Sequence, residues 1–255
     1  MKKKTGRWLI LLLSIGLIAA ATAYALSTNN TRWKVNGAAL TSGETHSVTS
    51  SAFSTQTLRS SGVEIQCTGV AGSALALTGS NSPNPGGAEG KLKYSGCTVP
   101  SFEKCKINGS RPGSFETKNL GIELVYLTKA GAEKEEIANG ISAMLVKPKE
   151  GTTLAEMSLS PAEECPTGGT VMITGKTGKT GIIFNALAAT ADEELEVHEI
   201  EAPPSSLKTY FTNNGSGTTE EHGGIGIEAN GGAATYQGRI RVNAGTGSKY
   251  NMIIP

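Results

Sequence analysis

Acidic side chains are the main candidates for catalytic chemistry in this chain of 255 residues. Of its 22 acidic residues, 21 are glutamates and only Asp192 is an aspartate. This composition excludes sites that need several aspartates, such as EF-hand loops and aspartic-protease dyads. It leaves open glycoside hydrolysis, which uses two carboxyl groups across a cleft. The sequence singles out no such pair, and the clusters within 133–136 and 193–196 are typical of solvated faces.

The segment from Thr174 to Gly181 contains Gly-Lys-Thr twice, which is part of a phosphate-binding loop. A complete loop has a glycine five residues before the one that precedes lysine, but Thr170 and Ile173 occupy those positions. The following residues, 182–184, are typical of a strand, whereas a phosphate-binding loop leads into a helix. We therefore interpret the repeat as a hairpin loop and expect no nucleotide cofactor.

Histidines offer no metal site. His198-Glu199 begins like a zinc-protease helix, but Ala202 stands where the second histidine belongs, and Pro203-Pro204 prevents the helix. His46 and His222 lie far away in the sequence, and no Gly-x-Ser-x-Gly nucleophile motif occurs. The sequence therefore predicts no catalytic residue, no metal and no cofactor.

The chain has four cysteines, Cys67, Cys97, Cys105 and Cys165. Because no two of them form a Cys-x-x-Cys pair, they predict two disulfides and not a zinc site. Four cysteines allow three connectivities. The residues between Cys97 and Cys105 are typical of a hairpin loop whose two stems end in cysteine. We therefore predict the pairs Cys97–Cys105 and Cys67–Cys165. The pattern Cys67–Cys97 with Cys105–Cys165 stays open.

The first 25 residues have the three parts of a secretory signal peptide. Positive charges at 2–4 and 7 precede an apolar run from Trp8 to Ala21, and small residues follow at Ala23 and Ala25. We predict cleavage between Ala25 and Leu26, with cleavage after Ala23 as second choice. An uncleaved anchor is the alternative, because the apolar stretch is about 18 residues, near the lower limit for a span. The prediction is a soluble, secreted or cell-envelope-associated protein without a membrane span after cleavage.

The charge balance argues against a nucleic-acid partner. The whole chain carries a net charge of +1, but four of its 23 basic residues lie in the leader. Residues 26–255 therefore have 19 basic against 22 acidic residues, a net charge of −3. Nucleic-acid binding needs clustered lysine and arginine, and no long basic run occurs.

Short segments with alternating or β-branched apolar residues recur after the leader. In Glu194–Ile200, polar and apolar residues alternate with a period of two, as in a half-buried strand. The strand candidates are Arg32–Asn36, Val63–Thr68, Lys91–Ser95, Gly121–Thr128, Ser142–Lys147, Thr170–Thr174, Gly181–Asn185, Glu194–Glu199, Ile225–Glu228, Tyr236–Asn243 and Asn251–Ile254.

Turn signals separate these segments and indicate the fold class. Asn-Gly occurs five times, beginning at Asn36, Asn108, Asn139, Asn214 and Asn230, and favours tight hairpins because both residues can adopt positive φ. No βαβ alternation indicates a parallel sheet. We predict an all-β fold, either an antiparallel β-sandwich or an irregular Greek-key barrel, with little helix. Residues 26–255 form one domain or two stacked β units with a joint within 148–168.

Several segments, taken in order over residues 33–255, resemble a family of exported, uncharacterised actinobacterial proteins. The segments are Trp33-Lys-Val-Asn-Gly37, Val63-Glu-Ile-Gln-Cys67-Thr68, Tyr94-Ser-Gly-Cys97-Thr-Val99, Cys105-Lys-Ile107, Cys165-Pro-Thr-Gly168, Asn213-Asn214-Gly215 and Tyr236-Gln-Gly238. The resemblance implies a cysteine-stabilised, β-rich secreted protein. It carries over no catalytic residue.

The functional prediction is a secreted or envelope-associated β-module with a binding or structural role and no enzymatic activity. Its ligand is unknown, and a glycan or protein at the cell surface is the expected class of partner. The alternative is a secreted glycan hydrolase that uses two glutamates. Two glutamate carboxyls ~5–10 Å apart on opposite walls of a cleft would favour the alternative.

Overall fold

The computed structural model describes residues 32–60, 62–79, 86–127, 141–166, 169–175, 182–187, 195, 197–202, 209–213, 219–223 and 226–253. The predicted leader and its cleavage point between Ala25 and Leu26 lie outside these ranges. Within them, the regular structure consists of strands and one short 3-10 turn, η1, at Ala162–Glu164. The predicted all-β fold is confirmed.

The described residues form twenty strands. In order they are β1 (Arg32–Val35), β2 (Ala38–Ala39), β3 (Thr45–Ser47), β4 (Thr49–Ala52), β5 (Gln56–Ser60), β6 (Val63–Thr78), β7 (Gly87–Thr98), β8 (Lys106–Ile107), β9 (Gly113–Glu116), β10 (Leu120–Leu127), β11 (Ile141–Pro148), β12 (Thr153–Ser160), β13 (Gly169–Gly175), β14 (Ile182–Leu187), β15 (Val197–Ala202), β16 (Thr209–Asn213), β17 (Thr219–Gly223), β18 (Ile227–Ala229), β19 (Gly232–Asn243) and β20 (Tyr250–Ile253).

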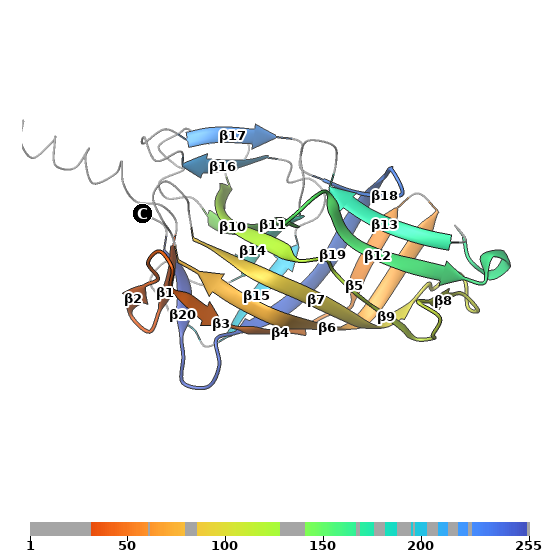
Figure 1. The fold of residues 1–255 in the computed structure, drawn as a ribbon, viewed down its shortest axis with the longest axis horizontal. Coiled ribbons are helices and arrows are strands. Elements are labelled where there is room, and N and C mark those ends of the chain that lie inside the picture. Colours follow the sequence, from red (N-terminus) through yellow and green to blue (C-terminus); the bar gives the residue numbers. More distant parts are fainter. Residues whose placement is uncertain are drawn as a thin grey trace, which may run out of the picture.

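Three long strands, β6, β7 and β19, run through the body of the molecule (Figure 1). Their two halves pair with different neighbours, and all of these ladders are antiparallel. The first half of β6 pairs with β5, whereas the second half pairs with β3 and β4. On β7, residues 87–90 pair with β10 and residues 93–97 with β9. On β19, residues 232–237 pair with β18 and β5, and residues 238–243 with β15 and β4.

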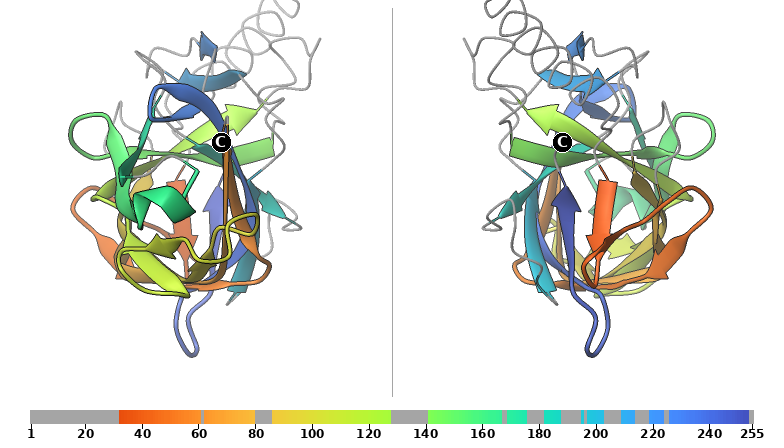
Figure 2. Two further views of the ribbon diagram at one scale, coloured as in Figure 1. Left: turned by 90° about the vertical axis from the view of Figure 1, so that its right-hand side faces the viewer. Right: turned by 90° about the vertical axis from the view of Figure 1, so that its left-hand side faces the viewer.

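The ladders close into two rings that share these three strands. The first ring runs β6–β7–β10–β11–β14–β15–β19–β4 and back to β6. The second ring runs β6–β7–β9–β12–β13–β18–β19–β5 and back to β6. Its step from β9 to β12 is the isolated bridge between Thr117, which directly follows β9, and Ala155 on β12. Figure 2 views the molecule from each end and shows the strands arranged around a common axis. Of the two predicted architectures, the closed rings correspond to a barrel.

Alternation along β6 explains how the strands face the core. Val63, Ile65 and Cys67 are buried, while Glu64 and Gln66 between them are partly exposed. Successive residues of a strand point to opposite faces, so this pattern directs every second side chain into the rings. The same alternation on the neighbouring strands builds one continuous apolar core.

A small sheet closes the free end of the first ring. Strand β1 pairs with β2 and β20 at the end of the molecule opposite β8 (Figure 1). Trp33 on β1 is only 2% exposed, and its indole N–H donates a hydrogen bond to the carbonyl of Gly87. Its ring lies 6.0 Å from that of Tyr250 on β20. Burial of these two aromatic rings therefore attaches the ends of the described chain to the first ring.

Three of the predicted Asn-Gly hairpins are confirmed, at Asn36, Asn108 and Asn230. Each asparagine has φ near +50° and the glycine after it also has positive φ, as a tight hairpin turn requires. The pairs beginning at Asn139 and Asn214 extend outside the described residues.

Each of these three asparagines also holds a residue of a distant segment. The backbone N–H of Asn108 donates to the carbonyl of Ser158 at 2.8 Å, and its side-chain Oδ1 accepts from the N–H of Ser158 at 2.7 Å. Asn36 makes the same pair of bonds with Lys249, and Asn230 makes it with Met172. We call this arrangement the asparagine clamp. The turns therefore add cross-links between segments besides reversing the chain.

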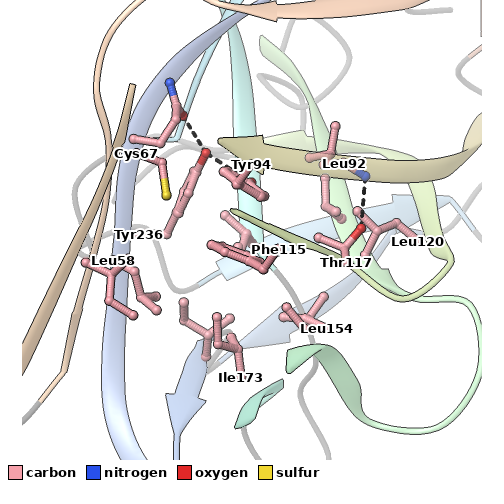
Figure 3. Close-up of a pocket in the computed structure, with 16 residues that line it drawn as sticks. Leu58, Cys67, Leu92, Tyr94, Phe115, Thr117, Leu120, Leu154, Ile173 and Tyr236 are labelled. Carbon is pink, nitrogen blue, oxygen red and sulfur yellow. Dashed lines mark hydrogen bonds between the residues drawn. The ribbon is translucent and has the colours of Figure 1, made fainter. Parts of the chain in front are cut away.

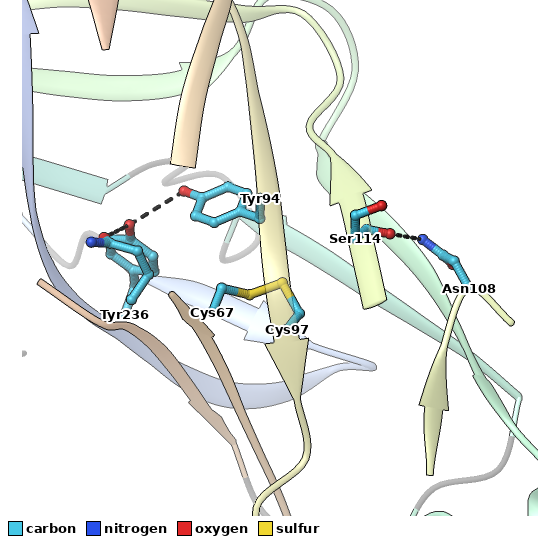
Figure 4. Close-up of a disulfide and its surroundings, with 7 residues drawn as sticks. Cys67, Tyr94, Cys97, Asn108, Ser114 and Tyr236 are labelled. Atoms are coloured by element: carbon cyan, nitrogen blue, oxygen red, sulfur yellow. Dashed lines mark hydrogen bonds between the residues drawn. A yellow bond between two sulfur atoms is a disulfide. The ribbon is translucent and has the colours of Figure 1, made fainter. Parts of the chain in front are cut away.

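The predicted disulfides Cys97–Cys105 and Cys67–Cys165 are wrong, because the structure pairs Cys67 with Cys97 and Cys105 with Cys165. Cys67 and Cys97 lie directly opposite each other on β6 and β7, with a Cα–Cα distance of 4.0 Å (Figure 4). The prediction treated Cys97 as the end of a hairpin stem, but β7 pairs with β6 there. The chain turns away after Val99, and Cys105 instead reaches Cys165 beside η1.

Candidate functional site

A cavity lies inside the molecule where the two rings meet. Its lining comes from both rings and from the shared strands β6, β7 and β19. The cavity volume is about 50 Å³, and the space beside it is open in part to solvent. A void of this size holds only part of a small molecule.

Apolar and aromatic groups form most of the lining. Leu58, Leu154 and Ile173 face the aromatic rings of Phe115 and Tyr236 (Figure 3). The rings of Tyr94 and Phe115 stack at 4.8 Å between centroids, and Tyr94 meets Tyr236 edge-on at 6.4 Å. Among the described residues that line the cavity, none carries a charge at neutral pH. The lining of the cavity therefore favours apolar ligands.

The polar side chains of one wall form a chain of hydrogen bonds. The Nε2 group of Gln56 donates to the carbonyls of Ser54 at 2.6 Å and Arg239 at 2.8 Å, which fixes the orientation of the amide. Its Oε1 consequently accepts from the hydroxyl of Tyr236. Tyr236 in turn accepts from the hydroxyl of Tyr94 at 3.3 Å. These groups mostly satisfy one another, as buried polar groups must.

Burial keeps both tyrosines protonated over the physiological range. Loss of solvation raises the pKa of Tyr94 to about 12, and the hydrogen bond to Tyr236 opposes part of that rise. The pKa of Tyr236 is raised well above its usual value, chiefly by burial and also by the neighbouring Tyr94. Both hydroxyls are therefore neutral, and neither provides a base or a nucleophile near pH 7.

A glycine on β19 makes room for this hydrogen-bonded wall. A Cβ atom at Gly238 would lie 2.1 Å from Oε1 and 2.6 Å from Cδ of Gln56. No φ constraint explains the glycine, since its backbone is not in the left-handed region. The close approach of the amide therefore requires it.

Thr117 holds the junction of the rings together at another point of the lining. Its Oγ1 accepts from the N–H of Leu92 at 2.9 Å, and its own N–H donates to the carbonyl of Leu92. Thr117 also forms the isolated bridge to Ala155. The polar atoms of Thr117 are therefore hydrogen-bonded to backbone groups at the junction.

Glutamates lie on the outside of the described structure. Six of them form ion pairs with lysine or arginine at the surface, at Glu64, Glu89, Glu116, Glu123, Glu164 and Glu199. None of the described glutamates lines the cavity. The clusters at 133–136 and 193–196 fall outside the described side chains. The predicted alternative of a two-glutamate hydrolase therefore has no supporting cleft in this part of the chain.

Metal-ligating groups do not gather within the described ranges. No set of three His, Cys, Asp or Glu side chains is close enough there to hold a metal ion. The Nε2 atom of His46 lies 3.0 Å from the carbonyl oxygen of Ala244, which is a structural contact. The side chains of His198 and His222 are outside the description. All four cysteines are in disulfides.

No sequence signal marks the cavity residues as a site. Tyr94 and Tyr236 belong to the segments that carry the family resemblance, and as tyrosines of a chain with few aromatic residues they gave only weak support for sugar binding. A buried glutamine such as Gln56, which is 2% exposed, has no sequence signature that separates it from a surface glutamine. The cavity is assembled from distant strands, so no local motif marks it.

Comparisons with known proteins give this chain no relative. No protein-family model, no curated protein and no solved structure matches it. The resemblance to exported actinobacterial proteins therefore stays a prediction. In the ranges given above, no helix has the length and apolar character that crossing a lipid bilayer requires.

Proposed function

We propose that this protein is an extracytoplasmic, non-enzymatic binding protein that takes a small apolar molecule into the cavity between its two rings. The observation that supports this proposal is the lining, which is mostly apolar and carries no charge. The polar groups of Gln56 and Tyr236 in the lining are hydrogen-bonded within the protein. Burying apolar surface of a ligand there gains about 25 cal/mol per Å². No charged group in the described lining opposes entry of an apolar molecule.

The proposed location outside the cytoplasm has support from the sequence and from the disulfides. The leader has the composition of a signal peptide. Two disulfides are compatible with an oxidising compartment. A measured intact mass of the exported protein that begins at Leu26 would support this location, and a mass that retains 8–25 would contradict it.

Titration calorimetry with three neutral probes tests the proposed function. The probes are octan-1-ol, 2-cyclohexylethanol and toluene, and the protein is the exported form with its disulfides intact. Binding of at least one probe with one-to-one stoichiometry is expected. Absence of binding by all three would refute the proposal, and so would product release from cell-wall glycans incubated with the protein.

A pair of alanine-to-valine variants locates the binding. Ala155 lines the cavity and is 2% exposed, so Ala155→Val adds two carbons to a void of about 50 Å³. We expect this variant to lose at least tenfold in affinity. Ala233 on β19 is exposed and does not line the cavity, so Ala233→Val is the matched control and is expected to bind as the unaltered protein does.

A further inference from the structure

The shape of the cavity restricts the ligand further, on the assumption that the proposed function holds. An apolar protein cavity of ~150 Å³ accommodates benzene, whereas a water molecule occupies ~30 Å³ of liquid. The void of about 50 Å³ is therefore too small for a ring and has room for roughly two chain carbons. The remaining part of a ligand has to lie in the space that leads outward.

The polar groups of the lining offer no counter-charge to a charged ligand head group. Gln56 uses both amide hydrogens on the carbonyls of Ser54 and Arg239, and its oxygen accepts from Tyr236. Thr117 accepts from a backbone N–H at the other polar point of the lining. A carboxylate or an ammonium group buried there would lack a counter-charge, which is costly in an apolar surrounding.

The two rings present different strands on one side of the molecule. On one side of the molecule the first ring is formed by β11, β14 and β15, and the second ring by β12, β13 and β18. In the described registers, β13 pairs with β12 and β18, whereas β14 pairs with β11 and β15, and we call the line between these two sets of strands the seam. Val146, Ile173, Ile182 and Ile227 come from the strands on the two sides of this seam, and all four line the cavity.

We propose that the cavity takes the end of an unbranched alkyl chain of a free single-chain amphiphile, with the polar head left outside the seam. The chain end fills the narrow void, and the following methylenes lie against the isoleucines of the seam. The structure thus selects for chain width and not for the chemistry of the head group.

Two matched ligand pairs test this inference on the unaltered protein. Octan-1-ol and 2-cyclohexylethanol have the same number of carbons and the same head, but the second ends in a ring. We expect octan-1-ol to bind at least tenfold more tightly. Octan-1-ol and octanoate have the same chain with a neutral or a charged head, and their affinities are expected to agree within about threefold at pH 7.

Chain length supplies a third measurement. Each methylene that leaves water for the protein raises affinity about fourfold, from a transfer free energy of ~0.8 kcal/mol. The rise from hexan-1-ol to octan-1-ol should therefore be many-fold, and Ala155→Val should reduce it while Ala233→Val leaves it unchanged.

Three outcomes would overturn the inference, and two of them leave the proposed function standing. Equal or tighter binding of 2-cyclohexylethanol would show that the cavity widens to accept rings. A tenfold preference for octan-1-ol over octanoate would place the head group inside. Cosedimentation with phosphatidylcholine vesicles without any binding of octan-1-ol, 2-cyclohexylethanol or toluene would refute both this inference and the proposed function.

Discussion

Replacement of Gly238 by alanine provides the sharpest test of the hydrogen-bonded wall. The added methyl would lie 2.1 Å from Oε1 of Gln56, so the amide has to move. Moving it breaks the bonds to the carbonyls of Ser54 and Arg239 and the bond from Tyr236. Each buried polar group left without a partner costs about 1–3 kcal/mol. Removing a glycine from a strand returns about 0.5–1 kcal/mol. We expect Gly238→Ala to lower the free energy of unfolding by about 2–4 kcal/mol.

Gly232 is the matched control on the same strand. A Cβ at Gly232 would have the carbonyl oxygen of Ala229 as its nearest neighbour at 3.5 Å, an ordinary contact. Gly232→Ala should therefore be neutral or stabilise by up to ~1 kcal/mol. Urea unfolding followed by far-UV circular dichroism, with the disulfides oxidised, measures both variants, and an unchanged m-value shows that only stability has altered.

A double variant distinguishes the proposed clash with Gln56 from a general sensitivity of β19 to substitution. Gln56→Ala removes the side chain that Gly238→Ala would strike. The double variant should therefore be at least as stable as Gln56→Ala alone, and more stable by up to ~1 kcal/mol. If the two costs simply add, or if Gly238→Ala is no worse than Gly232→Ala, then the close approach to Gln56 does not explain the glycine.

Three further predictions concern the cross-links and the buried tyrosines. Replacing Cys105 and Cys165 together by alanine opens a closed loop with a sequence separation of 60 and should cost about 4 kcal/mol on the chain-entropy model, and a loss below ~1 kcal/mol in urea unfolding would contradict that account. Asn108→Ala removes the side-chain bond of the asparagine clamp to Ser158 and places alanine at positive φ, so about 2 kcal/mol should be lost. Asn108→Asp keeps the acceptor oxygen and should lose less in the same assay. Stability should fall between pH 10 and 12, because a tyrosine in the unfolded chain ionises near ~10 while the pKa of Tyr94 in the fold is about 12 and the folded state holds the proton longer. Unfolding measured at pH 9, 10 and 11 should show a shallower fall for Tyr94→Phe, and an equal slope would refute the assignment.

The strands that the sequence predicted are those with regular apolar alternation or β-branched residues. Every strand candidate overlaps an observed strand. The length of β6 was underestimated, because after Thr68 it continues through glycine, alanine and serine, which carry little strand signal. Two of these glycines pack closely, since a Cβ at Gly69 would lie 2.3 Å from Oγ of Ser95, and one at Gly72 would lie 2.0 Å from Leu75.

Strands β4 and β12 are two of the strands that the sequence did not predict, and they were missed for different reasons. Strand β4 consists of small and hydroxyl-bearing residues, and its pairing with β6 and β19 decides its conformation. The sequence of β12 lies between Pro148 and Pro161. Because the prolines there predicted a joint between two β units, the alternation of apolar and polar residues between them was not interpreted as a strand. In the structure the chain passes from the first ring to the second between β11 and β12.

Disulfide connectivity and the cavity both depend on pairings between segments that are distant in sequence. The register that places Cys67 opposite Cys97 follows from the whole β6–β7 ladder, which includes a bulge between Ser73 and Ala76. The composition of the loop between Cys97 and Cys105 does not determine that register. The cavity depends in the same way on where the rings join, and therefore on strand pairings across most of the chain.

The sharing of β19 by both rings has a consequence for the export that we propose. Strand β19 is the next-to-last strand of the chain, and it completes each ring by pairing with β4 or β5 near residue 50 and with β15 or β18. A chain that crosses a membrane with its N-terminus leading therefore cannot close either ring until about residue 243 has emerged. During most of the crossing, the emerged strands have open edges that invite pairing with other chains. The disulfide between β6 and β7 needs only residues 67 and 97, so it can form early and hold one hairpin in register while the rest of the chain arrives.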